Sequence, residues 1–337
     1  AREELGPTAC GVGGAAYRRS DVTRGTPRGL QICGSHWEPA SDRDRTARTE
    51  ARPTVVFLHG NSSSRVEAKA ILSCCLAVGA SVFAIDFAGS GHSEGEYVSL
   101  GYHEQGDVAA VMRHLRARGC KRVVLWGRSM GAATTLMYAA SLSAGETAAS
   151  SALSAEEKAE READGEALAG LVLDSPFSDF TTLAEEQVQR ARDSGVTAPG
   201  MLVSLLMSYL ADAVKESAGF DPRELRPIDG AERATKPALF IVARDDRFVT
   251  PSHGRGIHEK YGADKGLLLV RGSHNTPRPA GLFDASIGFL RHCLRVPATL
   301  AQPRGVTPHN DLLPPWESLQ RMREEALAAA EMRAAQR

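Results

Sequence analysis

Short apolar runs alternate with helix-length amphipathic segments along the middle of the chain. The runs are apolar at consecutive positions, which is typical of strands buried on both faces of a parallel sheet. They lie at Thr54–Leu58, Ser81–Asp86, Arg122–Trp126, Leu171–Leu173, Ala238–Ala243 and Gly266–Val270, and a separate strand is expected earlier, at Gly29–Trp37. Helical patterns separate them at Val66–Leu76, His103–Arg118, Ala132–Ser141, Ser252–Tyr261 and Phe283–Leu294. This alternation predicts an α/β fold, a doubly wound and mostly parallel sheet with helices on both faces.

The alternation of predicted strands and helices indicates one domain with a segment appended at each end. We expect an N-terminal extension at 1–28, an α/β domain at 29–295, and a tail at 296–337 that is Pro-rich and then helical. Two stretches interrupt the domain. Residues 141–169 form an acidic, low-complexity insertion with no core of its own to bury. Residues 181–235 have room for two or three helices and predict a small helical lid.

The charge balance excludes two classes of partner. The 40 Lys and Arg residues face 41 Asp and Glu residues, which gives a net charge of −1. A chain without a basic excess carries no field to hold nucleic acid or an anionic membrane. The most hydrophobic stretch, Met201–Ala211, is shorter than the roughly 20 residues of a membrane span, so no integral membrane segment is expected. The chain opens on Ala1 without a visible signal peptide, which suggests a processed or incomplete N-terminus.

The cysteines predict neither a disulfide framework nor a metal centre. There are six in 337 residues, Cys74 and Cys75 are adjacent, and no C-x-x-C spacing occurs. Sparse, irregularly spaced cysteines favour a reducing compartment, and hence a cytoplasmic location. We expect no metal and no cofactor.

One pentapeptide, Gly127-Arg128-Ser129-Met130-Gly131, has the form G-x-S-x-G. A buried-strand pattern precedes it and a helix start follows it, as a sharp strand-to-helix turn requires. Such a turn raises the serine hydroxyl above the sheet at a helix N-terminus, where negative charge is favoured. Ser129 is therefore the candidate nucleophile.

A second pentapeptide of the same form, Gly91-His92-Ser93-Glu94-Gly95, serves as an internal comparison. It has no strand directly before it and no helix directly after it. We therefore interpret Ser93 as part of a tight turn at the carboxyl edge of the sheet.

A nucleophilic serine needs a base, and the base needs a carboxylate to orient it. Asp245 and Asp246 follow one predicted core strand, and His274 follows the next. Both strands end at the carboxyl edge, where open α/β sheets bind ligands. His274 is the candidate base, whereas spacing alone does not separate Asp245 from Asp246. Asp174, after the preceding strand, is a weaker alternative.

Several blocks of residues resemble the α/β-hydrolase superfamily, from about Gly29 to Leu294. More narrowly, the chain is similar to the serine aminopeptidase-like "hydrolase-4" (S33-type) group, with its uncharacterised plant, protist and bacterial members, and to the protein depalmitoylase-like branch. The blocks are Phe57-Leu58-His59-Gly60-Asn61-Ser62, Asp86-Phe87-Ala88-Gly89-Ser90-Gly91, Tyr97-Val98-Ser99-Leu100-Gly101, Leu125–Gly131, Leu173-Asp174-Ser175-Pro176-Phe177-Ser178 and His274-Asn275.

The resemblance implies roles for further residues. It implies an oxyanion hole made by the backbone N–H groups of Asn61 and Met130, with His59 as a structural residue of that turn. It places the acid at Asp246. The chain departs from the family at Ala243, where relatives usually have glycine.

These observations favour a serine hydrolase of the esterase or thioesterase type, acting on a small-molecule or acylated substrate. Ser129, His274 and Asp246 would form the catalytic triad. A peptidase with the same triad is the alternative within enzymes. A non-catalytic scaffold with this fold is the alternative outside them, and such proteins usually lose the serine or the histidine, both of which this chain keeps.

Overall fold

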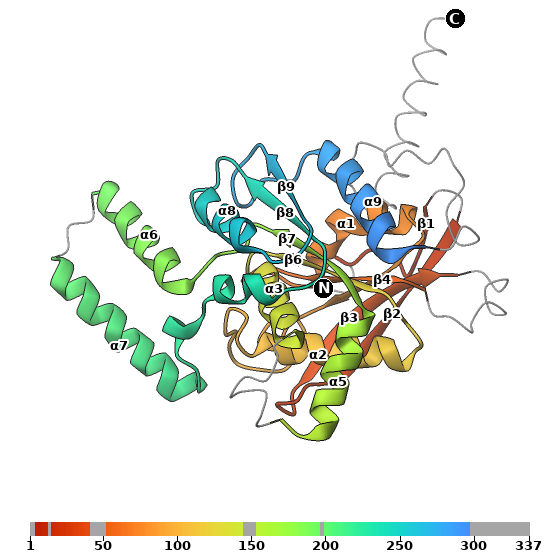
Figure 1. Ribbon diagram of the computed structural model, residues 1–337, viewed down its shortest axis with the longest axis horizontal. Coiled ribbons are helices and arrows are strands. Elements are labelled where there is room, and N and C mark those ends of the chain that lie inside the picture. Colours follow the sequence, from red (N-terminus) through yellow and green to blue (C-terminus); the bar gives the residue numbers. More distant parts are fainter. Residues whose placement is uncertain (1–3, 13–14, 41–51, 144–152, 196–198, 297–337) are drawn as a thin grey trace, which may run out of the picture.

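Nine strands in the described part of the chain form one sheet, as Figure 1 shows for this computed structural model. The structure describes residues 4–12, 15–40, 52–143, 153–195 and 199–296. The strand order is β1-β2-β3-β5-β4-β6-β7-β8-β9. Strands β4 to β9 pair in parallel, whereas β1, β2 and β3 are antiparallel, so the predicted mostly parallel sheet is confirmed. The bounds are β1 Ala9–Val12, β2 Ala15–Gly25, β3 Gln31–Pro39, β4 Thr54–Leu58, β5 Ser81–Ile85, β6 Val123–Arg128, β7 Leu168–Asp174, β8 Ala238–Ala243 and β9 Lys265–Val270.

The N-terminal residues belong to this sheet, so the expected domain boundary at residue 29 is wrong. Strand β2 pairs with β3 along its whole length, and the buried Tyr17 hydroxyl donates to the Leu76 carbonyl at 2.9 Å. The sequence of β2 contains no continuous apolar run, because this strand alternates exposed polar and buried residues at the outer part of the sheet. The predicted tail lies outside the described residues beyond Val296.

Helices cover both faces of the sheet, and each face has its own apolar core. Helices α1 and α9 contact each other over the face formed by residues such as Val55, Phe57 and Trp126. Helices α2, α3 and α8 cover the opposite face, to which Val56 and Leu58 point. Neighbouring residues of one strand thus enter different cores, which explains the unbroken apolar runs. The helices are η2 Arg65–Ala68, α1 Lys69–Ala77, α2 Glu104–Ala117, α3 Met130–Leu142, α8 Pro251–Lys260 and α9 Ala280–Leu294.

The acidic stretch at 141–169 is more structured than its composition predicts. Helix α5 (Ala155–Ala167) leads directly into β7. Its Asp164 is buried, 2.5 Å from Arg116 Nε and 2.6 Å from the Tyr138 hydroxyl that donates to it. The expectation that this stretch buries nothing is therefore wrong for α5, where one aspartate anchors an otherwise charged, solvated helix. Residues 144–152 lie outside the described residues.

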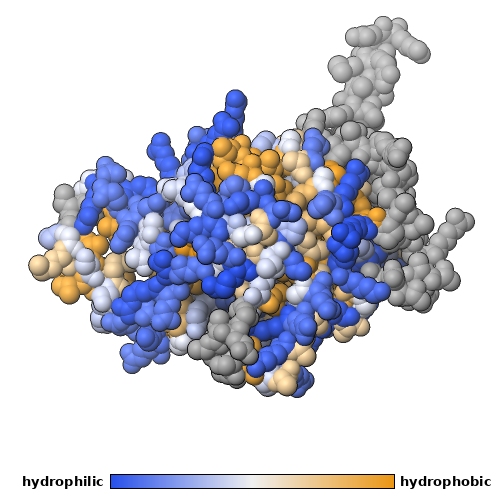
Figure 2. Space-filling model, in the orientation of Figure 1, coloured by the Kyte–Doolittle hydropathy of each residue, from blue (hydrophilic) through white to orange (hydrophobic). Residues whose placement is uncertain are grey.

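The segment 181–235, which we call the lid segment, contains two helices and two short 3₁₀ turns. They are α6 (Phe180–Asp193), α7 (Gly200–Ala218), η3 (Pro222–Glu224) and η4 (Pro227–Arg233). Helices α6 and α7 project away from the sheet at the left of Figure 1. Apolar side chains on α7 are exposed, among them Met201, Leu205 and Tyr209, and apolar surface is visible at this end of the molecule in Figure 2. Within the described ranges, no helix has the length and hydropathy needed to cross a bilayer.

Candidate active site

Ser129 lies at the turn between β6 and α3. Its backbone has φ 50° and ψ −113°, a conformation that is strained for a residue with a side chain. A Cβ atom on Gly127 would lie 2.2 Å from the Gly131 carbonyl oxygen, and one on Gly131 would lie 2.1 Å from the Leu58 carbonyl oxygen. Both glycines of the pentapeptide are therefore required for the turn that presents Ser129 at the helix N-terminus.

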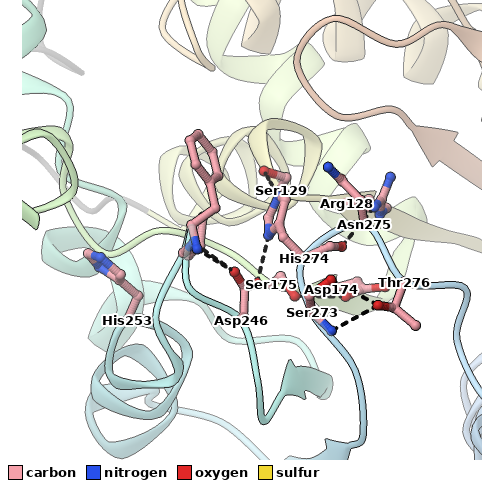
Figure 3. A network of polar contacts seen from close by, with 12 residues as sticks. Arg128, Ser129, Asp174, Ser175, Asp246, His253, Ser273, His274, Asn275 and Thr276 are labelled. Carbon is pink, nitrogen blue, oxygen red and sulfur yellow. Dashed lines mark hydrogen bonds and ion pairs between the residues drawn. The ribbon is translucent and has the colours of Figure 1, made fainter. Parts of the chain in front are cut away.

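His274 and Asp246 lie beside Ser129 in a continuous chain of polar contacts (Figure 3). Ser129 Oγ is 3.0 Å from His274 Nε2, and His274 Nδ1 is 2.7 Å from Asp246 Oδ2. With Nδ1 protonated and donating to the carboxylate, Nε2 is left to accept the proton of the serine. The second oxygen of Asp246 accepts the backbone N–H groups of Phe248 and Val249, each at 2.9 Å. The carboxylate is therefore held in one orientation by three donors.

The structure separates the three candidate carboxylates. Asp246 is the one that reaches His274, and it is buried. Asp245 instead accepts the backbone N–H of Gly272 at 3.0 Å. Asp174 is buried in an ion pair with Arg278, whose Nη2 donates to it at 2.7 Å. Of the three, Asp246 therefore stays the predicted acid.

The turn after β4 lies against the nucleophile. A Cβ atom on Gly60, the residue before Asn61, would be 3.6 Å from Ser129 Cβ. The Met130 N–H belongs to the first residue of α3, where backbone donors have no partner within the helix. Within the described residues, no acceptor takes either N–H. These two donors remain the predicted oxyanion hole.

His59 serves the same turn as a structural residue. It is fully buried, its Nδ1 donates to the Gly60 carbonyl at 2.7 Å, and its Nε2 accepts the Phe87 N–H at 3.0 Å. Burial lowers the pKa of His59, although the bond to Gly60 acts in the opposite direction. With both ring nitrogens engaged, this histidine is not available as a second base.

Ser93, in the second pentapeptide, lies in a tight turn. Its hydroxyl donates to the Asp86 carbonyl at 2.6 Å and accepts the Cys33 N–H at 2.8 Å. Gly91 is needed there because a Cβ atom would lie 2.3 Å from Asp86 Cγ. The same five-residue form thus has a purely structural purpose where the flanking strand and helix are missing.

Two polar clusters around Ser129, His274 and Asp246 were not predicted from the sequence. Arg128, within the pentapeptide itself, donates to the His274 carbonyl at 2.9 Å and pairs with Glu67. The G-x-S-x-G form could have drawn attention to Arg128, because its variable position lies next to the nucleophile. The second cluster joins α6 to the loop that carries Asp246.

That second cluster is centred on His253 of α8. Its Nδ1 accepts the Ser178 N–H at 3.1 Å, and its Nε2 lies 3.3 Å from Glu186 of α6. The Thr250 hydroxyl donates to Glu186 at 2.9 Å, and a neighbouring residue of α6, Gln187, donates to the carbonyl of Phe248 at 2.8 Å. Helix α6 is therefore bonded to the segment that immediately follows the acid.

A cavity of about 1140 Å³ lies between α6, α7 and the loop at residues 97–100. No residue of the triad lines it. Two of its lining residues, Leu100 and Phe180, also pack on an apolar cluster with Ala133 and Val249. Ala133 lies one helical turn beyond Ser129, and the Val249 N–H contacts Asp246, so this cluster connects the cavity with the triad.

Among the described residues, no group of three or more His, Cys, Asp or Glu side chains is arranged to hold a metal ion. All six cysteines are free thiols.

Comparisons with known proteins agree with this architecture. A family model described as "Alpha/beta hydrolase family" matches residues 55–285. An uncharacterized protein, YqkD of Bacillus subtilis (strain 168), is 26% identical over 225 residues, which are 66% of this chain. The match spans 64% of YqkD, less than two thirds of its length.

Solved structures of esterases share the fold at low sequence identity. The esterase Pf2001 of Pyrococcus furiosus is 19% identical with a TM-score of 0.57, and the match covers 82% of this chain and 94% of that one. Acetyl xylan esterase 1 of Thermoanaerobacterium sp. JW/SL YS485 is 17% identical with a TM-score of 0.55, over 82% of this chain and 83% of that one. The narrower hydrolase-4 and depalmitoylase-like branches stay predictions. The sheet, the strand-to-helix turn and the family match together identify the chain as a member of the alpha/beta hydrolase family.

Proposed function

We propose that this protein is a serine hydrolase that cleaves a carboxylic ester or thioester through an acyl-enzyme on Ser129. The observation that carries the proposal is the hydrogen-bonded chain from Ser129 through His274 to Asp246, at a turn that both flanking glycines are needed to form. Joint presence of nucleophile, base and orienting acid in contact is the arrangement that acyl transfer requires.

The reaction follows from which atoms can exchange protons. Ser129 Oγ attacks the carbonyl carbon of the substrate while His274 Nε2 takes the hydroxyl proton. The bond to the leaving alcohol or thiol breaks, and His274 returns that proton to the leaving group. Water then attacks the acyl-enzyme, gives its proton to His274, and releases the acid as Ser129 regains its hydrogen. Asp246 stabilises the imidazolium in both halves.

Negative charge on the carbonyl oxygen is the second requirement. The Asn61 and Met130 N–H groups would stabilise it in both tetrahedral intermediates. One such donor is worth about 10²–10³ in kcat in comparable sites. The position of Met130 at a helix N-terminus adds the favourable end of the helix dipole.

The esters cleaved by this site are those of a small-molecule or acylated substrate. The structural neighbours named above are esterases, which supports ester hydrolysis ahead of peptide hydrolysis as the reaction to test. The cavity between α6 and α7, rich in apolar side chains, is the part of the lid segment able to accept an acyl chain.

Covalent labelling tests the proposal directly. A fluorophosphonate should react with Ser129, because His274 activates the hydroxyl and the phosphonyl oxygen enters the oxyanion hole. Ser129→Ala and His274→Ala should each abolish labelling and hydrolysis of p-nitrophenyl acetate. Ser93→Ala is the matched control, since its serine lies in the same pentapeptide form, and it should label normally. Labelling that persists in Ser129→Ala, or a folded wild-type protein that never labels, would refute the assignment.

A further inference from the structure

Arg128 connects three parts of the candidate site. Its Nη2 donates to the His274 carbonyl at 2.9 Å and to Asn275 Oδ1 at 3.3 Å. Its other nitrogen, Nη1, pairs with the carboxylate of Glu67 on η2. Arg128 itself directly precedes Ser129, so one guanidinium joins the nucleophile turn, the base loop and η2 (Figure 3 shows the first two).

Glu67 lies close to the place where an oxyanion would form. Its Oε2 accepts the Gly60 N–H at 3.0 Å, immediately before the predicted donor Asn61. The position that a Cβ atom of Gly60 would occupy is 3.6 Å from Ser129 Cβ and 3.9 Å from Glu67 Oε2. A carboxylate beside the Gly60 turn repels the negative charge that develops on a carbonyl oxygen near Ser129, unless a cation compensates that carboxylate.

Arg128 is the cation that pairs with Glu67. The other charges that act on Arg128 are Asp174, Arg278 and Asp246. Asp174 and Arg278 pair with each other, and Asp246 bonds to His274. The side chains of Arg128 and Glu67 are 23% and 14% exposed, so solvent screens their interaction only in part.

We propose that Arg128 is a positioning residue that neutralises Glu67 beside the oxyanion hole while it holds the His274 backbone against Ser129. Glu67 orients the Gly60 turn, and Arg128 prevents its charge from opposing the transition state. Because the negative charge is absent from the bound substrate and develops on the way to the tetrahedral intermediate, loss of the compensation lowers kcat and leaves KM nearly unchanged. This inference rests on the proposed role of Ser129.

A charge-rescue experiment separates this role from simple packing. Steady-state hydrolysis of p-nitrophenyl acetate is measured for Arg128→Met, Glu67→Gln and the double variant. Arg128→Met should lower kcat by about 10–100-fold, since it leaves Glu67 uncompensated. Glu67→Gln alone should lower kcat less than Arg128→Met does, because its amide oxygen can still accept the Gly60 N–H and no net negative charge is left near the oxyanion. The double variant should recover at least about fivefold of the Arg128→Met loss.

Two further variants guard against misfolding. Arg128→Lys keeps the charge and should retain kcat within about fivefold of wild type, which keeps the proposal testable if Arg128→Met does not fold. Arg116→Met is the matched structural control: Arg116 is 22% exposed, pairs with Asp164, and lies in α2 away from the triad. It should lower the urea midpoint of unfolding while kcat of the folded protein stays unchanged.

The outcomes are distinct. A double variant as slow as Arg128→Met would overturn the inference, and so would an Arg128→Lys variant as slow as Arg128→Met, or an Arg128→Met variant with wild-type kcat. In each of these cases Ser129-dependent hydrolysis by the wild-type protein would leave the proposed function standing. Hydrolysis that persists in Ser129→Ala would overturn both.

Discussion

Replacing Asp246 by asparagine tests how the acid orients the base. The Phe248 and Val249 N–H groups both donate to Asp246 Oδ1. An asparagine keeps these two bonds only with its oxygen toward the backbone, which turns its NH₂ group toward His274 Nδ1. Two backbone bonds at about 1 kcal/mol each favour that orientation by roughly 2 kcal/mol, or about 30-fold. His274 must then accept at Nδ1 and carry its proton on Nε2, where it cannot take the proton of Ser129.

The expected loss in kcat for p-nitrophenyl acetate is about 10⁴-fold, the effect of the same exchange in other Ser-His-Asp sites. Asp245→Asn is the neighbouring control. Asp245 has a single backbone partner, Gly272, so the variant should keep kcat within about threefold. The reasoning would be refuted by equal losses in the two variants, or by a loss below about tenfold for Asp246→Asn with an intact fold.

Three further changes give graded tests. Gly131→Ala should lower the free energy of unfolding by about 2–3 kcal/mol in urea titrations, because its Cβ would strike backbone 2.1 Å away; Gly281→Ala, with open space around it, should not, and equal effects would contradict the required turn. Ala211→Trp should lower kcat/KM for p-nitrophenyl decanoate about tenfold but not for the acetate, whereas Leu205→Ala, 62% exposed and outside the cavity lining, should change neither. A shared loss on both esters would argue against an acyl chain in the cavity. Burial raises the pKa of Asp107 from 3.8 to about 7, so its stabilising contribution is present below pH 3.8 and is lost as the pH rises to 7. The free energy of unfolding of Asp107→Asn relative to wild type should therefore increase across that window, at up to about 1.4 kcal/mol per pH unit. A difference that does not depend on pH would contradict the raised pKa.

The parts of the fold and site that sequence reasoning reached have local signals. Buried parallel strands are visible in the sequence as apolar runs. The two glycines that the turn at Ser129 requires lie within the same five residues as the serine. His274 and Asp246 follow consecutive core strands, so their order along the chain already places them at one edge of the sheet. The half-exposed strand β2 has no such run, so its sequence predicts an extension instead of a strand.

Polar contacts between distant segments have no local signal. Arg128 pairs with Glu67 across 61 positions, and Arg116 with Asp164 across 48. Nothing in the composition of the acidic stretch distinguishes Asp164 from its exposed neighbours. Likewise, the apolar residues of α7 are not alike: Leu205 and Leu206 are exposed, whereas Val203, Met207 and Ala211 line the cavity. Helical periodicity shows which residues share a face but not what that face meets.

The attachment of α6 to the loop behind Asp246 makes the cavity and the triad thermodynamically linked. Helix α6 lines the cavity, partly through Glu186, and it also bonds through Glu186 to Thr250 and through Gln187 to Phe248. A ligand that moves α6 must therefore strain or release the backbone that orients the acid. Linkage is reciprocal. Under the proposed mechanism, any change that this ligand makes in the free energy of acylating Ser129 would therefore be matched by an equal change in the affinity of the acylated protein for the ligand. A long acyl group would then act in two ways, because it would occupy the cavity and also modify the serine.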